Sequence, residues 1–277
     1  MTIYSEPKWQ QHTEFDGYDD PRVFIPLSSN GGCPIGCKYC YIPNLGKEPV
    51  PIESAAFDEL LRKTTEDPQY IQGRTLVSFG CVDDPFYPSL VPNLIKGLSH
   101  FASVQQPGQP VIQIASKLMV PEEIFNLSQD WPQNVYAPTV SVSITSIKNA
   151  PKIEPNAPSP EDRAKNFDTL QKMGWYSLAM MKPYLPTMPD EVDTFADLYT
   201  RHTPDAVVIG SRHKKNSRSN NRRNKPHAVA PDWSRVDNNE EMQDFAAQLQ
   251  RALAERALGH VPVFDSSVKA AIHFITH

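Results

Sequence analysis

The chain has 277 residues, and its 27 lysines and arginines against 32 aspartates and glutamates give a net charge of −5 at pH 7. This length is enough for one large domain, and no stretch approaches the roughly 20 consecutive apolar residues that span a bilayer. The sequence therefore predicts a soluble, cytoplasmic protein without a membrane partner.

The predicted elements alternate between strand and helix along the chain. In chain order they are a strand at 22–27, a helix at 53–65, a strand at 74–82, a helix at 91–104, a strand at 110–117, a helix at 121–129, a strand at 137–146, a helix at 160–173, a strand at 175–182, a helix at 190–202 and a strand at 205–210. The helix at 160–173 is the best marked, because Ser159 is a favourable N-cap, Pro160 suits the first turn and Gly174 ends it. Six strands separated by helices predict an α/β fold, a parallel sheet with helices outside that is open or partly closed as a barrel.

The strand faces carry a second pattern, because neighbouring side chains of a strand point to opposite sides. One face of the fourth strand holds Ser141, Ser143 and Thr145, and one face of the third holds Gln113 and Lys117. Alternation along the second strand places Cys81 on one face with Thr75, Val77 and Phe79. Buried parallel strands are usually apolar on both faces, so the polar faces predict a wet or ligand-filled cavity, with an edge strand facing solvent as the alternative.

The segment GGCPIGCKYCYIP, residues 31–43, holds three of the four cysteines directly after the first strand. Cys33, Cys37 and Cys40 follow the spacing C-x3-C-x2-C, which lets one loop supply three thiolates to a 4Fe-4S cluster and leaves the fourth iron open. A structural zinc site is the alternative, although such sites usually join two separated pairs of ligands. Three unconnected buried thiols would leave the clustering unexplained.

In this loop the sequence resembles the radical S-adenosylmethionine (SAM) enzymes, which carry C-x3-C-x2-C after the first strand of a partial (β/α)6 barrel of parallel strands. CKYCYIP, GCVDDPFYP, IASK, SVSIT and PNAPSPEDR are similar to the spore photoproduct lyase-like branch, over residues 23 to about 210. The resemblance implies that the open iron chelates SAM, that the reduced cluster cleaves its C5'–S bond, and that a 5'-deoxyadenosyl radical abstracts hydrogen from a substrate. It also implies a reducing partner such as flavodoxin or ferredoxin.

The resemblance assigns hydrogen transfer to residues near the cluster. Cys81 corresponds to a cysteine that returns hydrogen to the product radical, although a free cysteine often merely packs in a core. Tyr39 and Tyr41 flank the last cysteine of the loop. They are expected to contact SAM or to relay hydrogen with Cys81, and the alternative is that they only shield the cluster from solvent.

A second set of residues is predicted to bind SAM at the strand ends. Asp83 and Asp84 are expected to accept hydrogen bonds from its ammonium group, and Lys117 is expected to pair with its carboxylate. A turn before Pro85 is the alternative role for the aspartates, and a solvated lysine is the alternative for Lys117. Ser143 is a candidate ligand of the ribose, and Glu154 and Arg163 are expected to order that side. The alternative for these two is a surface acid and a helical arginine.

The chain divides into an N-terminal extension (1–22), the barrel (23–210), a basic loop (211–239) and a C-terminal helix with a closing segment (240–277). The basic loop holds seven cations and no acid between residues 212 and 225, which are Arg212, Lys214, Lys215, Arg218, Arg222, Arg223 and Lys225. Lysine and arginine with Ser and Asn spacers suit phosphate oxygens. The alternative is a solvated loop.

These observations predict a radical SAM enzyme that abstracts hydrogen from a nucleobase in nucleic acid. By resemblance to the lyase, thymine or a modified thymine in DNA is the expected substrate, with repair, rearrangement or hypermodification as the outcome of a lyase or isomerase type of reaction. Two alternatives stay open. One is a radical SAM enzyme for a small metabolite or peptide, and the other is a zinc-stabilised nucleic-acid-binding module without catalysis.

Overall fold

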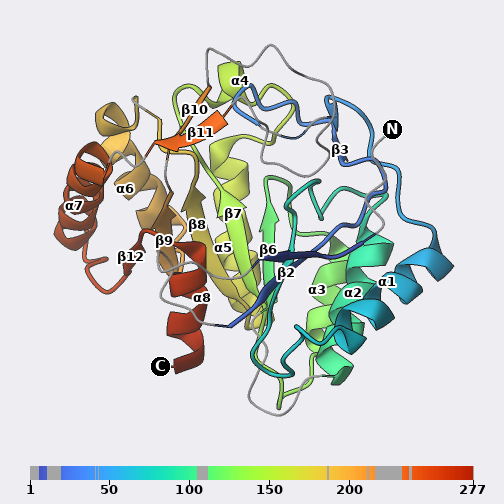
Figure 1. Ribbon diagram of the computed structural model, residues 1–277. Coiled ribbons are helices and arrows are strands. Elements are labelled where there is room, and N and C mark those ends of the chain that lie inside the picture. Colours follow the sequence, from blue (N-terminus) through green and yellow to red (C-terminus); the bar gives the residue numbers. More distant parts are fainter. Residues whose placement is uncertain are drawn as a thin grey trace.

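The computed structural model describes residues 6–10, 20–40, 42, 44–104, 112–185, 187–210, 212–215, 233–236 and 239–276. Its centre is an eight-stranded sheet in the order β1-β2-β5-β6-β7-β8-β9-β12 (Figure 1). All neighbouring pairs are parallel except β1 with β2. The predicted α/β fold with a mostly parallel sheet is therefore confirmed.

The elements follow the predicted alternation of strand and helix. The strands of the main sheet are β1 (Lys8–Gln10), β2 (Arg22–Ile25), β5 (Leu76–Phe79), β6 (Ile112–Ser116), β7 (Thr139–Ser143), β8 (Tyr176–Met181), β9 (Ala206–Ile209) and β12 (Val263–Phe264). Two small sheets are formed by β3 (Gly32–Cys33) with β4 (Asn44–Leu45), and by β10 (Arg212–Lys215) with β11 (Trp233–Val236). The helices are α1 (Ser54–Glu66), α2 (Val91–Val104), α3 (Glu122–Gln129), α4 (Ala150–Ile153), α5 (Pro160–Met173), the 3-10 helix η1 (Met188–Glu191), α6 (Val192–Arg201), α7 (Asn239–Glu255) and α8 (Ser267–Thr276).

Helix α5 shows how local sequence fixes an element. The Ser159 hydroxyl accepts a hydrogen bond from the Asp162 amide at 3.0 Å, and Pro160 occupies the first turn. Gly174 ends the helix in the left-handed region at φ 68°. Cap, proline and glycine each stand where the sequence predicted them, because these signals act within a few residues.

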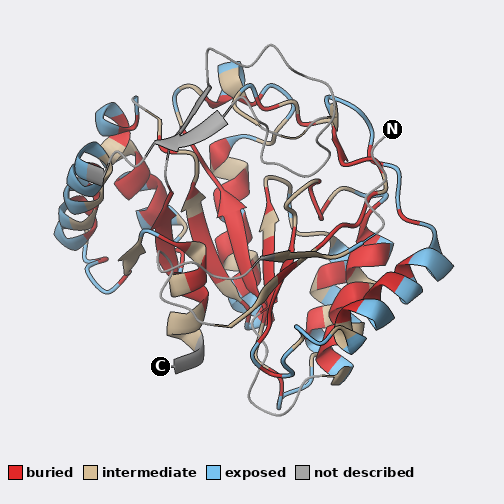
Figure 2. Ribbon diagram, in the orientation of Figure 1, coloured by how far each residue is buried: buried red, intermediate tan, exposed pale blue. Residues whose placement is uncertain are grey.

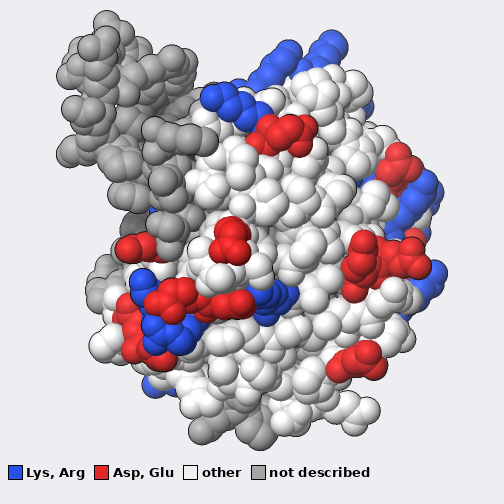
Figure 3. Space-filling model, turned by 90° about the vertical axis from the view of Figure 1, so that its right-hand side faces the viewer, with Lys and Arg blue, Asp and Glu red and all other residues white. Residues whose placement is uncertain are grey.

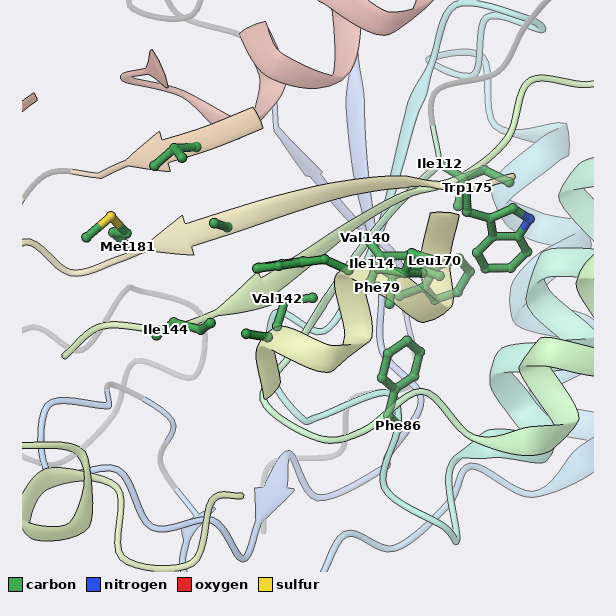
Figure 4. Packing of buried hydrophobic residues seen from close by; sticks show 14 of the residues in the cluster. Phe79, Phe86, Ile112, Ile114, Val140, Val142, Ile144, Leu170, Trp175 and Met181 are labelled. Atoms are coloured by element: carbon green, nitrogen blue, oxygen red, sulfur yellow. The ribbon is translucent and has the colours of Figure 1, made fainter. Parts of the chain in front are cut away.

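One side of the sheet packs against the helices and forms the main core. This core contains Val140 and Val142 of β7 and Ile144 just after it. They lie there with Phe79, Ile114, Leu170 and Trp175 (Figure 4). The strands are buried along the centre of the molecule, while the outer faces of the surrounding helices are exposed (Figure 2). Among the described residues, no helix has the length and apolar character needed to cross a bilayer.

Helix α8 packs against the other side of the sheet. Val268 and Ala271 contact Leu76, the first residue of β5, and the Phe274 ring stacks on Tyr176, the first residue of β8, with centroids 4.4 Å apart. The closing segment therefore covers the amino ends of the strands. The cysteine loop lies at the opposite, carboxyl ends of the strands.

The polar strand faces are only partly as predicted. Ser141, Ser143 and Gln113 are at most 5% exposed and lie on strands inside the sheet, so the edge-strand alternative is wrong. The prediction for the second strand is also wrong, because Val77 and Phe79 belong to the helix-side core. Ser78, rather than its neighbours, lies on the polar face, where its hydroxyl accepts a hydrogen bond from Arg22 at 2.9 Å.

Candidate functional site

The cysteine loop runs from Gly31 to Leu45 over the carboxyl ends of the strands. It is closed by pairing of Cys33 with Leu45 and by a hydrogen bond from the Gly46 amide to the Cys33 carbonyl at 2.8 Å. A side chain at Gly32 would clash with the Glu48 backbone, so the tight winding requires glycine there.

The three cysteines of the loop share one apolar cluster. Cys33 and Cys37 are 7% and 4% exposed and Cys40 is half-buried. The residues packed around them are Ile35, Tyr39, Ile42, Leu118 and Ala157. Burial raises the pKa of Cys33 to about 12 and that of Cys37 to about 11. Metal binding must therefore displace protons from these thiols.

The donor set fits an iron–sulfur cluster better than a structural zinc ion. Three sulfurs come from one loop, and thiolates are the ligands that such clusters use. Among the described residues, no three His, Cys, Asp or Glu side chains already stand together as a metal site. The second cysteine pair of a closed zinc site is missing from the sequence as well, since Cys81 is the one cysteine left.

A turn that follows α4 fixes the cysteine loop to the barrel. The Lys38 amide donates to the Ile153 carbonyl at 2.8 Å, and the Asn156 amide group donates to the Pro34 carbonyl at 2.9 Å. The Tyr39 hydroxyl donates to Glu154 and lies 2.9 Å from the Thr145 hydroxyl. Asn156 lies in the segment PNAPSPEDR that carries the resemblance, but no role was predicted for it, and the polar face of its strand was the signal for Thr145.

Glu154 is the centre of a buried charge network. Its Oε2 lies 2.6 Å from Arg163 Nη2 and its Oε1 lies 3.2 Å from Lys117 Nζ. Arg163 also donates to the Ser143 carbonyl at 2.6 Å, and Lys117 donates to the Ser143 hydroxyl. Burial acts to raise the pKa of Glu154, but Lys117 and Arg163 outweigh it and hold that pKa below its ordinary value. The structure thus brings together Tyr39 and four residues predicted to surround SAM.

The two aspartates have different surroundings. Both oxygens of Asp84 are occupied, by the Ser116 hydroxyl at 2.6 Å, the Phe86 amide at 3.2 Å and the Lys117 amide at 2.8 Å. Asp83 accepts three hydrogen bonds on Oδ2, from the Leu27 amide and from the amide and hydroxyl of Ser28. Asp83 Oδ1 is buried without a hydrogen-bond partner among the described residues. Burial raises the pKa of Asp83 to about 6 and also raises that of Asp84.

Cys81 has different neighbours from Cys33, Cys37 and Cys40. It lines a small recess with Lys8 and Phe24, which are paired across β1 and β2. Phe24 is in register with Ser78, so Cys81 stands beside the polar face. The alternation from which its face was predicted does not reach Cys81, because β5 ends at Phe79 and Gly80 turns the chain at φ 92°. Burial raises the pKa of Cys81 to about 12.

Of the basic segment, the structure describes two short strands. Arg212, Lys214 and Lys215 lie in β10, which pairs antiparallel with β11 directly after β9. The predicted loop therefore contains a two-stranded ribbon. The other predicted basic residues and one tyrosine lie outside the described residues, namely Arg218, Arg222, Arg223, Lys225 and Tyr41.

The face shown in Figure 3 gives no second candidate for binding a polyanion. Acidic and basic side chains are mixed on it, around a wide uncharged area. In α1, for example, Arg62 pairs with Glu59 at 2.7 Å.

No protein-family model matches this sequence, and no curated protein is similar enough to count as a match. Solved structures match over most of the chain. A spore photoproduct lyase mutant with bound AdoMet and dinucleoside spore photoproduct aligns with 94% of this chain and 79% of its own, at 13% identity and a TM-score of 0.61. The same lyase complexed with dinucleoside spore photoproduct aligns with 92% of this chain and 78% of its own, at 14% identity and a TM-score of 0.60. Streptococcus suis SuiB bound to S-adenosylmethionine aligns with 90% of this chain and 52% of its own, at 9% identity and a TM-score of 0.56. The chain therefore shares its fold with spore photoproduct lyase and SuiB.

Proposed function

We propose that this protein is a radical SAM enzyme that holds a 4Fe-4S cluster through Cys33, Cys37 and Cys40. The observation that carries the proposal is a loop of three buried or half-buried thiols at the carboxyl ends of a sheet whose fold is shared with proteins solved with SAM bound. When bound, the cluster and SAM supply reductive cleavage of the sulfonium and a radical that removes hydrogen from a substrate. A reducing partner such as flavodoxin or ferredoxin is part of this proposal.

Asp83 is the better of the two aspartates for the SAM ammonium group. Its Oδ1 is a buried acceptor without a partner among the described residues, whereas both oxygens of Asp84 already accept hydrogen bonds from the protein. An unpaired buried acceptor is costly, and a cationic donor would remove that cost. Lys117 and Ser143, which contact each other, are proposed for the SAM carboxylate and ribose.

Cys81 is proposed to return a hydrogen atom to the product radical. A donor of hydrogen atoms must hold its S–H bond, and a thiol whose pKa is raised to about 12 stays protonated at neutral pH. The thiol is half-buried in a small recess that it lines together with Phe24. Tyr41 is proposed to assist this transfer.

The proposed substrate is a nucleobase in nucleic acid, with thymine or a modified thymine in DNA as the first candidate. The solved lyase complexed with dinucleoside spore photoproduct supports this choice, and so does a segment of seven basic residues that begins directly after β9. A base within a duplex would have to be extruded, at a cost of about a few kcal/mol. Repair, rearrangement and hypermodification of the base remain the proposed outcomes.

The test of the cluster is anaerobic reconstitution followed by iron and sulfide analysis. Two single-thiol variants provide a matched pair. Cys40→Ala should lose the cluster and all SAM cleavage, whereas Cys81→Ala should retain iron, sulfide and 5'-deoxyadenosine formation but give an altered product. Colourless wild-type protein with one zinc per chain would refute the proposal in favour of the zinc module.

The test of the substrate is transfer of deuterium from a labelled thymine oligonucleotide into 5'-deoxyadenosine. Binding of the oligonucleotide should weaken steeply with salt, because each phosphate contact releases a counterion. Replacing Arg218, Arg222 and Arg223 by Ser should lower both the affinity and this salt dependence. Cleavage of SAM without deuterium transfer or salt-dependent binding would favour a small metabolite or peptide substrate.

A further inference from the structure

Tyr39 bridges the cysteine loop and the body of the barrel. It lies between Cys37 and Cys40 in the sequence, and its ring packs in the cluster of cysteines. Its hydroxyl donates to Glu154 and lies 2.9 Å from the Thr145 hydroxyl. The group that the sequence placed in hydrogen transfer is thus hydrogen-bonded to residues beyond the loop.

The partner of Tyr39 is held on both of its oxygens by protein groups. Glu154 is 2% exposed, with Arg163 at 2.6 Å from Oε2 and Lys117 at 3.2 Å from Oε1. Arg163 is fully buried and is itself fixed to the Ser143 carbonyl. A carboxylate with its oxygens occupied in this way is a rigid anchor and a poor candidate for a cofactor ligand.

The same turn holds the cysteine loop at two further points. Ile153 accepts from the Lys38 amide, and Asn156 donates to the Pro34 carbonyl. Residues 153–156 are therefore hydrogen-bonded to the loop at Pro34, Lys38 and Tyr39, on both sides of Cys37. The hydroxyl of Tyr39 is the one contact of the three that ends in a charged group, and such hydrogen bonds are the stronger kind.

We propose that Tyr39 and Glu154 are positioning residues that lock the cysteine loop, in place of the hydrogen-transfer and cofactor-binding roles that the sequence implied. The inference rests on the proposed function, because the loop matters for catalysis only where it holds the cluster. Sites of this kind require their supporting contacts to fix the ligands within about 0.5 Å. A loosened loop would release iron more readily and change the environment of Cys37.

The test compares two substitutions that each remove one buried hydroxyl. Tyr39→Phe removes the bond to Glu154, whereas Tyr199→Phe removes a hydroxyl that has no hydrogen-bond partner among the described residues. Reconstituted proteins are mixed anaerobically with an iron chelator, without SAM or substrate. We expect iron loss about tenfold faster in Tyr39→Phe, as for loss of a hydrogen bond to a charged group, and no change in Tyr199→Phe.

Two further measurements separate positioning from general destabilisation. The electron paramagnetic resonance spectrum of the reduced cluster should shift in Tyr39→Phe and remain unchanged in Tyr199→Phe. In the metal-free protein, amide exchange in residues 35–40 should accelerate in Tyr39→Phe while exchange in α5 stays the same. Glu154→Gln should accelerate iron loss as well, with Glu161→Gln, which changes a half-exposed carboxylate, as its control.

The outcomes are distinguishable. If wild-type protein binds iron and Tyr39→Phe retains it as wild type does, with an altered product, Tyr39 acts in hydrogen transfer and the positioning role is overturned. Loss of SAM affinity in Glu154→Gln with normal iron retention would make Glu154 a cofactor ligand and overturn its assignment too. If the wild-type protein takes up no iron, the proposed function fails, and this inference fails with it.

Discussion

The buried ion pair between Arg163 and Glu154 allows a sharp prediction about stability. Arg163→Met keeps an unbranched, though shorter, side chain and removes its charge, leaving Glu154 with Lys117 as its remaining cation at 3.2 Å. Removing one partner of a buried pair costs about 3–5 kcal/mol. The Ser143 carbonyl also loses a donor at 2.6 Å, which adds to the cost, while Lys117 offsets part of it. We therefore expect the free energy of unfolding to fall by about 3–5 kcal/mol.

The assay is urea denaturation of the metal-free protein at pH 7, with Arg201→Met as the control. Arg201 pairs with Glu161 at 2.7 Å, almost the same distance as in the buried pair, but the two side chains are 54% and 46% exposed. An exposed pair contributes only about 0–1 kcal/mol. Equal losses in the two variants would refute the argument that burial decides the strength of the pair.

The pH dependence of the same variant provides a second check. Because the pKa of Glu154 is held below its ordinary value of 4.5, its contribution is present above pH 4.5 and is lost as the pH falls through the lower value of the folded state. The difference between wild type and Arg163→Met should therefore be largest near neutrality and shrink on acidification. A difference that grows in acid would contradict the sign of this linkage.

Three further predictions concern the segment after β5. Gly80→Ala forces a side chain into φ 92° and against the Ala115 carbonyl, so urea unfolding should show a larger loss than for Gly174→Ala, where φ is 68° and no atom lies within 4 Å of the new methyl group; equal losses would contradict it. The pKa of Asp83 is raised from 3.8 to about 6, so its contribution is present below the unfolded pKa and lost as the pH rises through the folded one. That loss should be about 3 kcal/mol and absent from Asp83→Asn, as measured by unfolding from pH 3 to 7. With the pKa of Cys81 raised to about 12, alkylation of that thiol at pH 8, followed by mass spectrometry, should be far slower than for an ordinary free thiol, and rapid labelling would show that it is not protected.

The elements whose signals are local could be predicted from the sequence. The boundaries of α5 follow from Ser159, Pro160 and Gly174, and the cysteine loop follows from its own spacing. By contrast β1 and β12, with three and two residues, are too short to show a period and form by pairing with β2 and β9. Their place in the sheet depends on tertiary contacts that no short window contains.

The candidate site was predictable as a set of residues but not as a set of contacts. Polar alternation singled out Ser143, and Glu154 and Arg163 were predicted to order the same side of the SAM site. The bond from Tyr39 to Glu154 joins residues 115 positions apart, and such a pairing leaves no local trace. The strand face that Cys81 occupies was predicted from alternation, which Gly80 interrupts. The sequence could not show this, because the positive φ of Gly80 cannot be read from neighbouring residues unless the turn is already known.

The position of helix α8 has a consequence for the order in which ligands bind. Because it covers the amino ends of the strands, ligands of the proposed site would approach from the carboxyl ends, where the cysteine loop lies. If the small cofactor binds at the loop first, a larger substrate can bind over it. If the substrate binds first, it would block the cofactor from the loop. For the proposed radical SAM activity, steady-state kinetics should therefore follow a compulsory order in which SAM binds before the substrate and its cleavage products dissociate after the product.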